Sequence, residues 1–236
     1  MNNRMGARLA RRLVDRLIRR DLQRTFRRVV WLSGVEALPD GPLVVYANHH
    51  SFYDGYLFWL LVRHTLRRPL VIWMEEWDLA PLFGPIGVLP FPAEDALRRT
   101  TTIRETARRL AADPRTVLLL FPEGDLRPPD QGLGAFRADL DRLARVLPEA
   151  VRWQPLGIHL TWWGEDRPTA LLSTSPPHDA PDGKEADRLR AALDATRAVS
   201  PAVLQENRAR LLLDGQPSVH ERWDLRALAP LFRRWT

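Results

Sequence analysis

Two histidines and an aspartate lie close together between two apolar runs of the sequence, in the stretch NHHSFYD at residues 48–54. A histidine whose tautomer is fixed by a carboxylate can take a proton from a hydroxyl group near neutral pH. Asp54 is the natural partner. On a continuous helix His50 and Asp54 share a face, whereas pairing of His49 with Asp54 requires the chain to turn between them. The alternative interpretation is a polar cap for a buried helix.

A second polar group follows the apolar run TVLLL. Phe121, Pro122, Glu123 and Gly124 come directly after it and place a carboxylate at the end of an expected strand. Glycine lets the backbone approach a ligand closely. The alternative interpretation is an ordinary turn, because proline and glycine end many strands.

The elements that must position these groups are short apolar runs separated by stretches of helical periodicity. We expect strands at residues 42–47, 69–74, 87–91, 116–121, 153–160 and 169–173, and helices at about 54–66, 94–112, 135–146, 184–213 and 223–235. This alternation predicts an α/β fold with a mixed, largely parallel sheet flanked by helices, an N-terminal amphipathic helix and a C-terminal helical extension. In such sheets ligands bind at the carboxyl ends of the strands.

Three segments are expected along the chain. Residues 1–30 form a cationic amphipathic helix, residues 31–175 an α/β core, and residues 176–236 a linker with C-terminal helices that pack on the core. No cysteine is present, which excludes disulfides and thiolate chemistry. The longest apolar run, residues 56–62, is far shorter than the roughly 20 residues that span a bilayer.

The first segment accounts for the net positive charge, since ten arginines against two aspartates give residues 1–30 a charge of +8, compared with +6 for the whole chain. Apolar side chains fall in one half of its helical wheel and arginines in the other. The apolar set is Leu13, Val14, Leu17, Ile18 and Leu22, and the basic set is Arg8, Arg12, Arg16, Arg19 and Arg20. Three interpretations follow: a helix packed on the domain, an interfacial helix on anionic lipid, or a nucleic-acid-binding helix. No aromatic platform accompanies the arginines, which disfavours the third.

Together the two polar stretches resemble the glycerolipid acyltransferase family, the enzymes that acylate glycerol-3-phosphate, 1-acylglycerol-3-phosphate and related lipids. NHHSFYD matches its motif of a histidine, four residues and an aspartate, with Asn48, His49, Ser51 and Asp54 in place, and residues 121–124 match its FPEG motif. A weaker fourth motif lies around Pro155. The resemblance covers about residues 30–175.

The resemblance implies catalysis by His49 as general base, oriented by Asp54. The substrate-binding residues that it implies are Asn48, Ser51, Phe121, Pro122, Glu123, Gly124 and Arg127. The expected reaction moves a fatty acyl group from acyl-CoA or an acyl carrier protein to a lipid hydroxyl, at the inner face of the cell membrane. The expected partners are the membrane lipid surface, the acyl donor and the lipid acceptor, with no bound cofactor, no metal and no nucleic acid.

Two departures from the family concern the acceptor. Its second motif carries an arginine for the acceptor phosphate where this chain has Pro92 and Ala93, and after FPEG this chain has Asp125 and Leu126, with Arg127 one place late. A carboxylate at position 125 would repel a phosphate, although Arg98, Arg99 or Arg127 could still reach one. The alternatives are therefore acylation of a non-phosphate lipid, such as a glycolipid or terpenoid glycoside, and a non-catalytic membrane-surface binding protein. A metal-dependent hydrolase is a further alternative, but the remaining histidines lack paired spacing.

Overall fold

The computed structural model describes residues 2–32, 38–206 and 209–223. In this part of the chain one sheet of eight strands has the order β4-β3-β5-β2-β6-β7-β1-β8. The strands are β1 (Arg28–Trp31), β2 (Leu43–Ala47), β3 (Leu70–Met74), β4 (Val88–Pro90), β5 (Val117–Leu120), β6 (Arg152–Thr161), β7 (Thr169–Thr174) and β8 (Arg210–Asp214). Strands β2 to β6 run in one direction, β7 and β1 in the other, and β8 turns back again. The predicted α/β class with a mixed, largely parallel sheet is confirmed.

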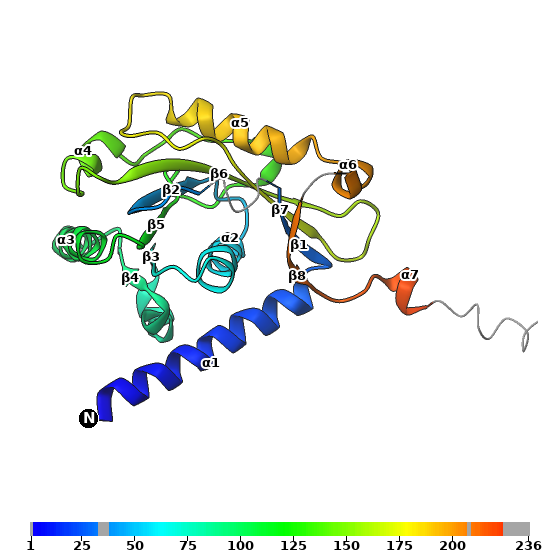
Figure 1. Cartoon of the computed structure of the whole chain (residues 1–236), viewed down its shortest axis with the longest axis horizontal. Coiled ribbons are helices and arrows are strands. Elements are labelled where there is room, and N and C mark those ends of the chain that lie inside the picture. The colour runs from blue at the N-terminus through cyan, green and yellow to red at the C-terminus, as the bar shows by residue number, and fades with distance from the viewer. Residues whose placement is uncertain (1, 33–37, 207–208, 224–236) are drawn as a thin grey trace, which may run out of the picture.

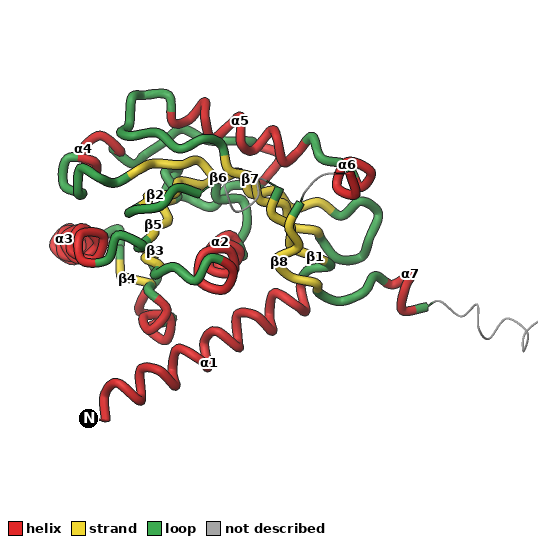
Figure 2. Tube along the Cα trace, in the orientation of Figure 1, coloured by secondary structure: helices red, strands yellow, loops and turns green. Residues whose placement is uncertain are grey.

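Helices cover both faces of this sheet, and Figures 1 and 2 show the strands between the two layers, with α1 and α5 on opposite sides. The α-helices are α1 (Asn2–Thr25), α2 (Asp54–Trp59), α3 (Ala96–Ala112), α4 (Leu140–Ala144), α5 (Glu185–Arg197), α6 (Pro201–Glu206) and α7 (Val219–Arg222). A π-helical segment, η2 (Leu60–Thr65), continues α2, and the 3₁₀ segments are η3 (Trp77–Leu79), η4 (Pro81–Ile86) and η5 (Pro129–Gln131).

The central strand β2 shows how the sequence builds the two layers. Successive side chains of a strand point to opposite faces, so Leu43 and Val45 join the core beneath α1 and α2, whereas Val44 and Tyr46 join the core beneath α3, α4 and α5. All five residues of β2 are buried. A strand covered on both faces reads as an unbroken apolar run, which is why the sequence predicted it well.

The apolar residues of helix α1 form two rows, one buried and one exposed. Val14, Ile18 and Leu22 are buried against the sheet, as the first interpretation of this helix expected. Leu13 and Leu17 remain 58% and 48% exposed. The amphipathic helix is therefore confirmed, and it packs on the core while keeping an apolar strip in solvent.

Several predicted elements need correction. Residues 210–213, predicted to be helical, form the edge strand β8, because they pair with β1 in antiparallel register and bury Leu213 in the core. Helix α4 begins at residue 140 and not at 135, because the backbone N–H groups of Arg137 and Ala138 bond to the Pro122 carbonyl. The helix expected at about residues 223–235 falls, from residue 224 on, outside the described residues.

The sheet also crosses the boundaries drawn at residues 30 and 175. Strand β1 begins inside the first segment, and it pairs with β7 on one side and with β8, from the last segment, on the other. The division of the chain into three segments remains a prediction.

Candidate active site

The chain turns sharply between β2 and α2, and this turn brings His49 to Asp54. Strand β2 ends at Ala47, residues 51–53 form the turn, and α2 begins at Asp54 itself. The His49 Nδ1 atom lies 3.0 Å from Asp54 Oδ2. A carboxylate oxygen only accepts hydrogen bonds, so Nδ1 carries the proton and Nε2 of the neutral ring is the basic nitrogen. The sequence left open whether His49 or His50 pairs with Asp54, and in the structure the His49 ring is the partner.

One oxygen of Asp54 organises the whole turn. Besides the His49 ring, Oδ2 accepts hydrogen bonds from the backbone N–H groups of His50 and Ser51, at 2.8 and 2.9 Å. The side chain is fully buried, and its backbone N–H donates to the Ser51 carbonyl. Three donors converging on one atom fix the orientation of the carboxylate, and through it the direction in which the His49 ring points.

The second motif supplies the other support of this ring. Phe121, which follows β5, stacks on His49 with the ring centroids 4.1 Å apart and the planes 14° from parallel. The His49 side chain stays 23% exposed. No hydrogen bond within the described residues engages its Nε2 atom. The basic nitrogen is therefore free for a ligand.

Asn48 lies in the interior and bonds to the neighbouring strand. Its amide donates to the carbonyl of Ile158 at 2.9 Å, and its side-chain oxygen accepts from the N–H of the same residue at 2.8 Å. The side chain is fully buried. Both polar groups of Asn48 are thus used to continue the pairing of β2 with β6 beyond the last residue of β2.

Glu123 ties the loop after β5 to the loop after β2. Its buried carboxylate accepts the backbone N–H of His49 at 3.2 Å and that of Gly134 at 2.7 Å. A further backbone bond runs from Arg127 N–H to the His49 carbonyl, at 2.8 Å. The two motifs, 74 residues apart in sequence, therefore form one unit.

The remaining residues of the implied binding set lie around this unit. The Ser51 hydroxyl accepts from Tyr53 N–H at 3.2 Å. Pro122 is buried and its carbonyl holds the following loop, whereas Gly124 is exposed, with a φ of 78° that favours glycine. Arg127 is partly exposed, with Nε 3.9 Å from Glu123.

The arginines considered for a phosphate already have partners. Arg98 makes two hydrogen bonds to Asp78, and Arg99 donates to the Pro92 carbonyl. Asp125 forms an ion pair with Arg137 at 2.5 Å. The Asp125 carboxylate is thus compensated by a residue of the same loop, which sequence reasoning did not consider.

Two more residues of the site, Gly134 and His159, were missed by sequence reasoning. Gly134 donates to Glu123, and the glycine-rich stretch at 132–134 was the signal that could have indicated it. The His50 ring reaches the same stretch through the carbonyl of Gly132, at 3.2 Å. His159 follows Ile158 on β6, and burial lowers its pKa, with smaller contributions from Arg197 and His50.

The residues that the structure describes contain no group of three or more histidine, cysteine, aspartate or glutamate side chains arranged to hold a metal ion. Nor does any helix in the described ranges have the length and apolar character needed to cross a membrane.

Comparisons with known proteins identify the family of this chain. The family model described as "Acyltransferase" matches residues 29–159, more than half of the chain, and includes both motifs. The crystal structure of the 1-acyl-sn-glycerophosphate (LPA) acyltransferase PlsC from Thermotoga maritima superposes with a TM-score of 0.53 at 18% identity, over 84% of this chain and 82% of that one. At 18% identity, this structural similarity is evidence for a shared fold alone. No curated protein sequence matches significantly. With both motifs joined at one edge of the sheet and the family model covering them, the chain belongs to the acyltransferase family.

Proposed function

We propose that this enzyme is a membrane-associated O-acyltransferase that moves a fatty acyl group from an acyl thioester to a hydroxyl of a lysophospholipid or related glycerolipid. The observation that carries the proposal is the His49–Asp54 pair, with Nδ1 held at 3.0 Å and Nε2 free. The donor is acyl-CoA or an acyl carrier protein.

The reaction needs no covalent enzyme intermediate. His49 Nε2 takes the proton of the acceptor hydroxyl as its oxygen attacks the thioester carbonyl. The tetrahedral intermediate then expels the thiol, which leaves with the proton that His49 returns. Asp54 stabilises the transient imidazolium through Nδ1, and the stacked Phe121 ring adds a cation–π contribution.

The oxyanion of the intermediate requires hydrogen-bond donors, and the amides nearest the catalytic histidine are occupied. The N–H of His49 donates to Glu123, and those of His50 and Ser51 donate to Asp54. These three amides hold the geometry of the base.

The acceptor is proposed to carry no terminal phosphate. Arg98 and Arg137 are paired with Asp78 and Asp125, and the partly exposed Arg127 lies near the buried Glu123. A guanidinium that already faces a carboxylate attracts a second anion less strongly. A lysophospholipid diester fits this arrangement, as does the hydroxyl of a glycolipid or terpenoid glycoside.

Membrane association is proposed through α1. Its exposed edge carries Met5, Leu9, Leu13 and Leu17 beside the exposed arginines of the same helix. Apolar side chains flanked by arginines suit the interface of an anionic bilayer, where each arginine contributes about 1 kcal/mol. The expected location is peripheral, on the inner face of the cell membrane.

The test is incubation of the purified chain with acyl thioesters and a pool of lipid acceptors, followed by mass spectrometry of the new esters. We expect His49→Ala to abolish transfer and Asp54→Asn to lower kcat by about a thousandfold, with unchanged circular dichroism. His50→Gln is the matched control, because glutamine can still donate to the Gly132 carbonyl, and it should keep most of the activity.

Full activity in His49→Ala or in Asp54→Asn would refute the assignment of the base. Inactivity of the wild type across phosphorylated, diester and glycosylated acceptors would favour the non-catalytic binding protein instead.

A further inference from the structure

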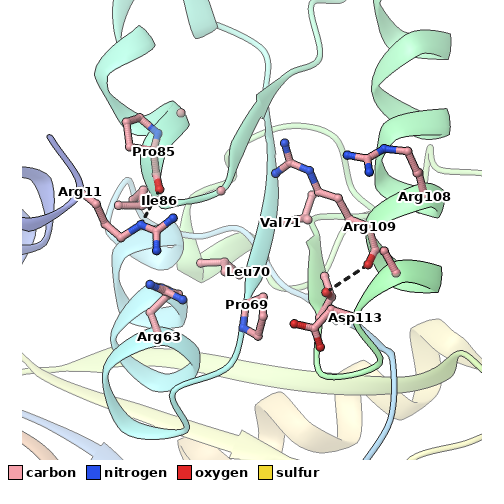
Figure 3. A pocket seen from close by; sticks show the side chains of 14 residues that line it. Arg11, Arg63, Pro69, Leu70, Val71, Pro85, Ile86, Arg108, Arg109 and Asp113 are labelled. Atoms are coloured by element: carbon pink, nitrogen blue, oxygen red, sulfur yellow. Dashed lines mark hydrogen bonds between the residues drawn. The ribbon is translucent and has the colours of Figure 1, made fainter. Parts of the chain in front are cut away.

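A cavity of about 450 Å³ opens at the edge of the sheet opposite to His49. Its walls come from α1, η2, the start of β3, η4 and the end of α3 (Figure 3). Pro69 precedes β3, Leu70 and Val71 begin it, and Thr116 precedes β5; both strands run parallel to β2. The cavity thus lies at the amino-terminal edge, whereas His49 follows the carboxyl end of β2. The two sites are distinct.

Arginines dominate the charged lining of this cavity. Arg11, Arg63, Arg108 and Arg109 line it, against a single carboxylate, that of Asp113. Arg108 and Arg109 share the carboxylate of Glu105, with contacts of 2.7 Å each. The Asp113 Oδ1 atom accepts from the backbone N–H of Arg115.

Within the described part of the chain, the side chains of Arg11 and Arg63 form hydrogen bonds only to carbonyl groups. Arg11 Nε donates to the Pro85 carbonyl at 3.0 Å, and Arg63 Nη1 to the Arg68 carbonyl at 3.4 Å. Across residues 2–32, 38–206 and 209–223, no carboxylate oxygen lies within 4 Å of either guanidinium. The Coulomb effect of Asp15 on Arg63 is smaller than that of Arg11. Within these ranges, neither cation forms an ion pair.

Arg11 and Arg63 concentrate their positive charge in one part of the cavity. Figure 3 shows the Arg11 and Arg63 guanidinium groups next to each other on one side of the cavity, with Arg109 on the other. Burial lowers the pKa of Arg63, and the positive charge of Arg11 lowers it further. A bound anion would offset both effects, because its attraction acts in a partly desolvated space.

We propose that this cavity binds a phosphate group, held by Arg11 and Arg63 and faced by Arg109. The planar guanidinium matches phosphate oxygens with paired hydrogen bonds, and the volume exceeds that of a phosphate ion, so a substituted phosphate also fits. The group comes either from a phospholipid head at the surface on which α1 lies or from a free phosphate in solution. The proposal does not depend on the catalytic function.

Binding would join two parts of the fold. Val14 is the first described residue of α1 that is buried in the core, so the turns before it lie on the core surface, with Leu9 and Leu13 exposed and Arg11 bonded to Pro85 of η4. A phosphate bridging Arg11 on α1 to Arg63 on η2 would fix these turns to the core. Occupancy of the cavity and the position of the amino-terminal helix are thereby linked.

The experiment is calorimetric titration of the full chain with inorganic phosphate at constant ionic strength, with chloride as the balancing anion. A second arm uses dihexanoyl phosphatidylglycerol below its micelle concentration. We expect Arg63→Gln and Arg11→Gln each to weaken binding about tenfold, because each loses a charge-assisted hydrogen bond. Arg12→Gln is the matched control, an exposed neighbour on α1 outside the cavity, and should bind like wild type.

Binding of inorganic phosphate that is weakened in the Arg63 and Arg11 variants supports a free-phosphate site, and binding of the lipid alone with the same weakening supports a headgroup site. Two variants from different elements keep the test valid if one fails to fold. Absence of binding in both arms, or affinities equal to wild type in the folded variants, would overturn the proposal.

Discussion

A single carboxylate oxygen and a single aromatic ring determine the orientation of His49, the proposed general base. Asp54 Oδ2 fixes the tautomer and direction of His49, and Phe121 fixes the plane of its ring from the other side. A base held by two independent contacts loses little conformational entropy when substrate arrives. The orientation of the His49 ring thus depends on the neighbouring residues Asp54 and Phe121.

Replacement of Phe121 tests the stacking contact. Phe121→Leu keeps the apolar volume but removes the ring, so we expect kcat to fall by up to about tenfold with little change in KM. Phe121→Tyr retains the stack and serves as the control in the same steady-state assay. Equal loss of kcat in both variants would mean that the packing of this position matters and the stacking does not.

At the scale of elements, the site depends on two loops that hold each other. The loop after β2 and the loop after β5 are joined by Glu123, by the Arg127 N–H and by the His50 ring. Asn48 then attaches the first loop to β6. Neighbouring parallel strands bring these loops to one edge, so the sheet gives rigid support to the proposed catalytic residue His49, which lies outside regular structure.

Asn48 is predicted to support the stability of this arrangement. Asn48→Leu would leave the buried N–H and carbonyl of Ile158 without partners, and we expect the free energy of unfolding to fall by about 2–5 kcal/mol. Urea denaturation followed by circular dichroism measures this loss. Asp95→Ala, which removes an exposed helix cap that bonds to Arg98 N–H, should lower it by only about 1 kcal/mol. A loss in Asn48→Leu no larger than that would contradict the role assigned here.

At the scale of the whole molecule, α1 is predicted to bring the chain to anionic lipid. The double variant Leu9→Ser, Leu13→Ser removes exposed apolar side chains without touching the buried ones, so it should float less with phosphatidylglycerol vesicles while keeping its thermal midpoint. Val146→Ser, at an exposed position beyond α4, is the control. Equal flotation of the three proteins at low salt would exclude α1 as the membrane contact.

Acid sensitivity of the fold is expected from three histidines outside the proposed catalytic pair. Burial is the largest cause of the lowered pKa values of His64, His159 and His178, each starting from 6.5. Between the lowered native pKa and 6.5 the unfolded chain binds more protons, so stability rises with pH and is lost as pH falls through 6.5.

The measurement is urea unfolding at several pH values from about 7.5 down to about 5.5, a window above that in which most carboxylates titrate. His178→Gln removes one titrating group and should give a shallower slope of unfolding free energy against pH. In the native fold His178 contacts the Tyr46 hydroxyl at 3.0 Å, a bond that the amide can replace. A slope identical to wild type would show that His178 does not contribute.

The sequence by itself determined the class of fold, the residues of both motifs and the pairing of a histidine with Asp54. Buried parallel strands appear as apolar runs, and the residues of each motif lie close together along the chain, so local pattern was sufficient. Strand β1 and the edge strand β8 were missed, because β1 is short and lies in an arginine-rich segment, and the leucines of β8 suit a helix equally well.

Only the tertiary structure decided the contacts between distant residues. Asn48 meets Ile158 across 110 positions, and nothing near either residue in the sequence indicates it. The same holds for the ion pair of Asp125 with Arg137 and for the absence of a carboxylate partner at Arg11 and Arg63 in the described part of the chain. Whether a charge is paired or free depends on which elements pack together, and that packing brings together residues from separate parts of the chain.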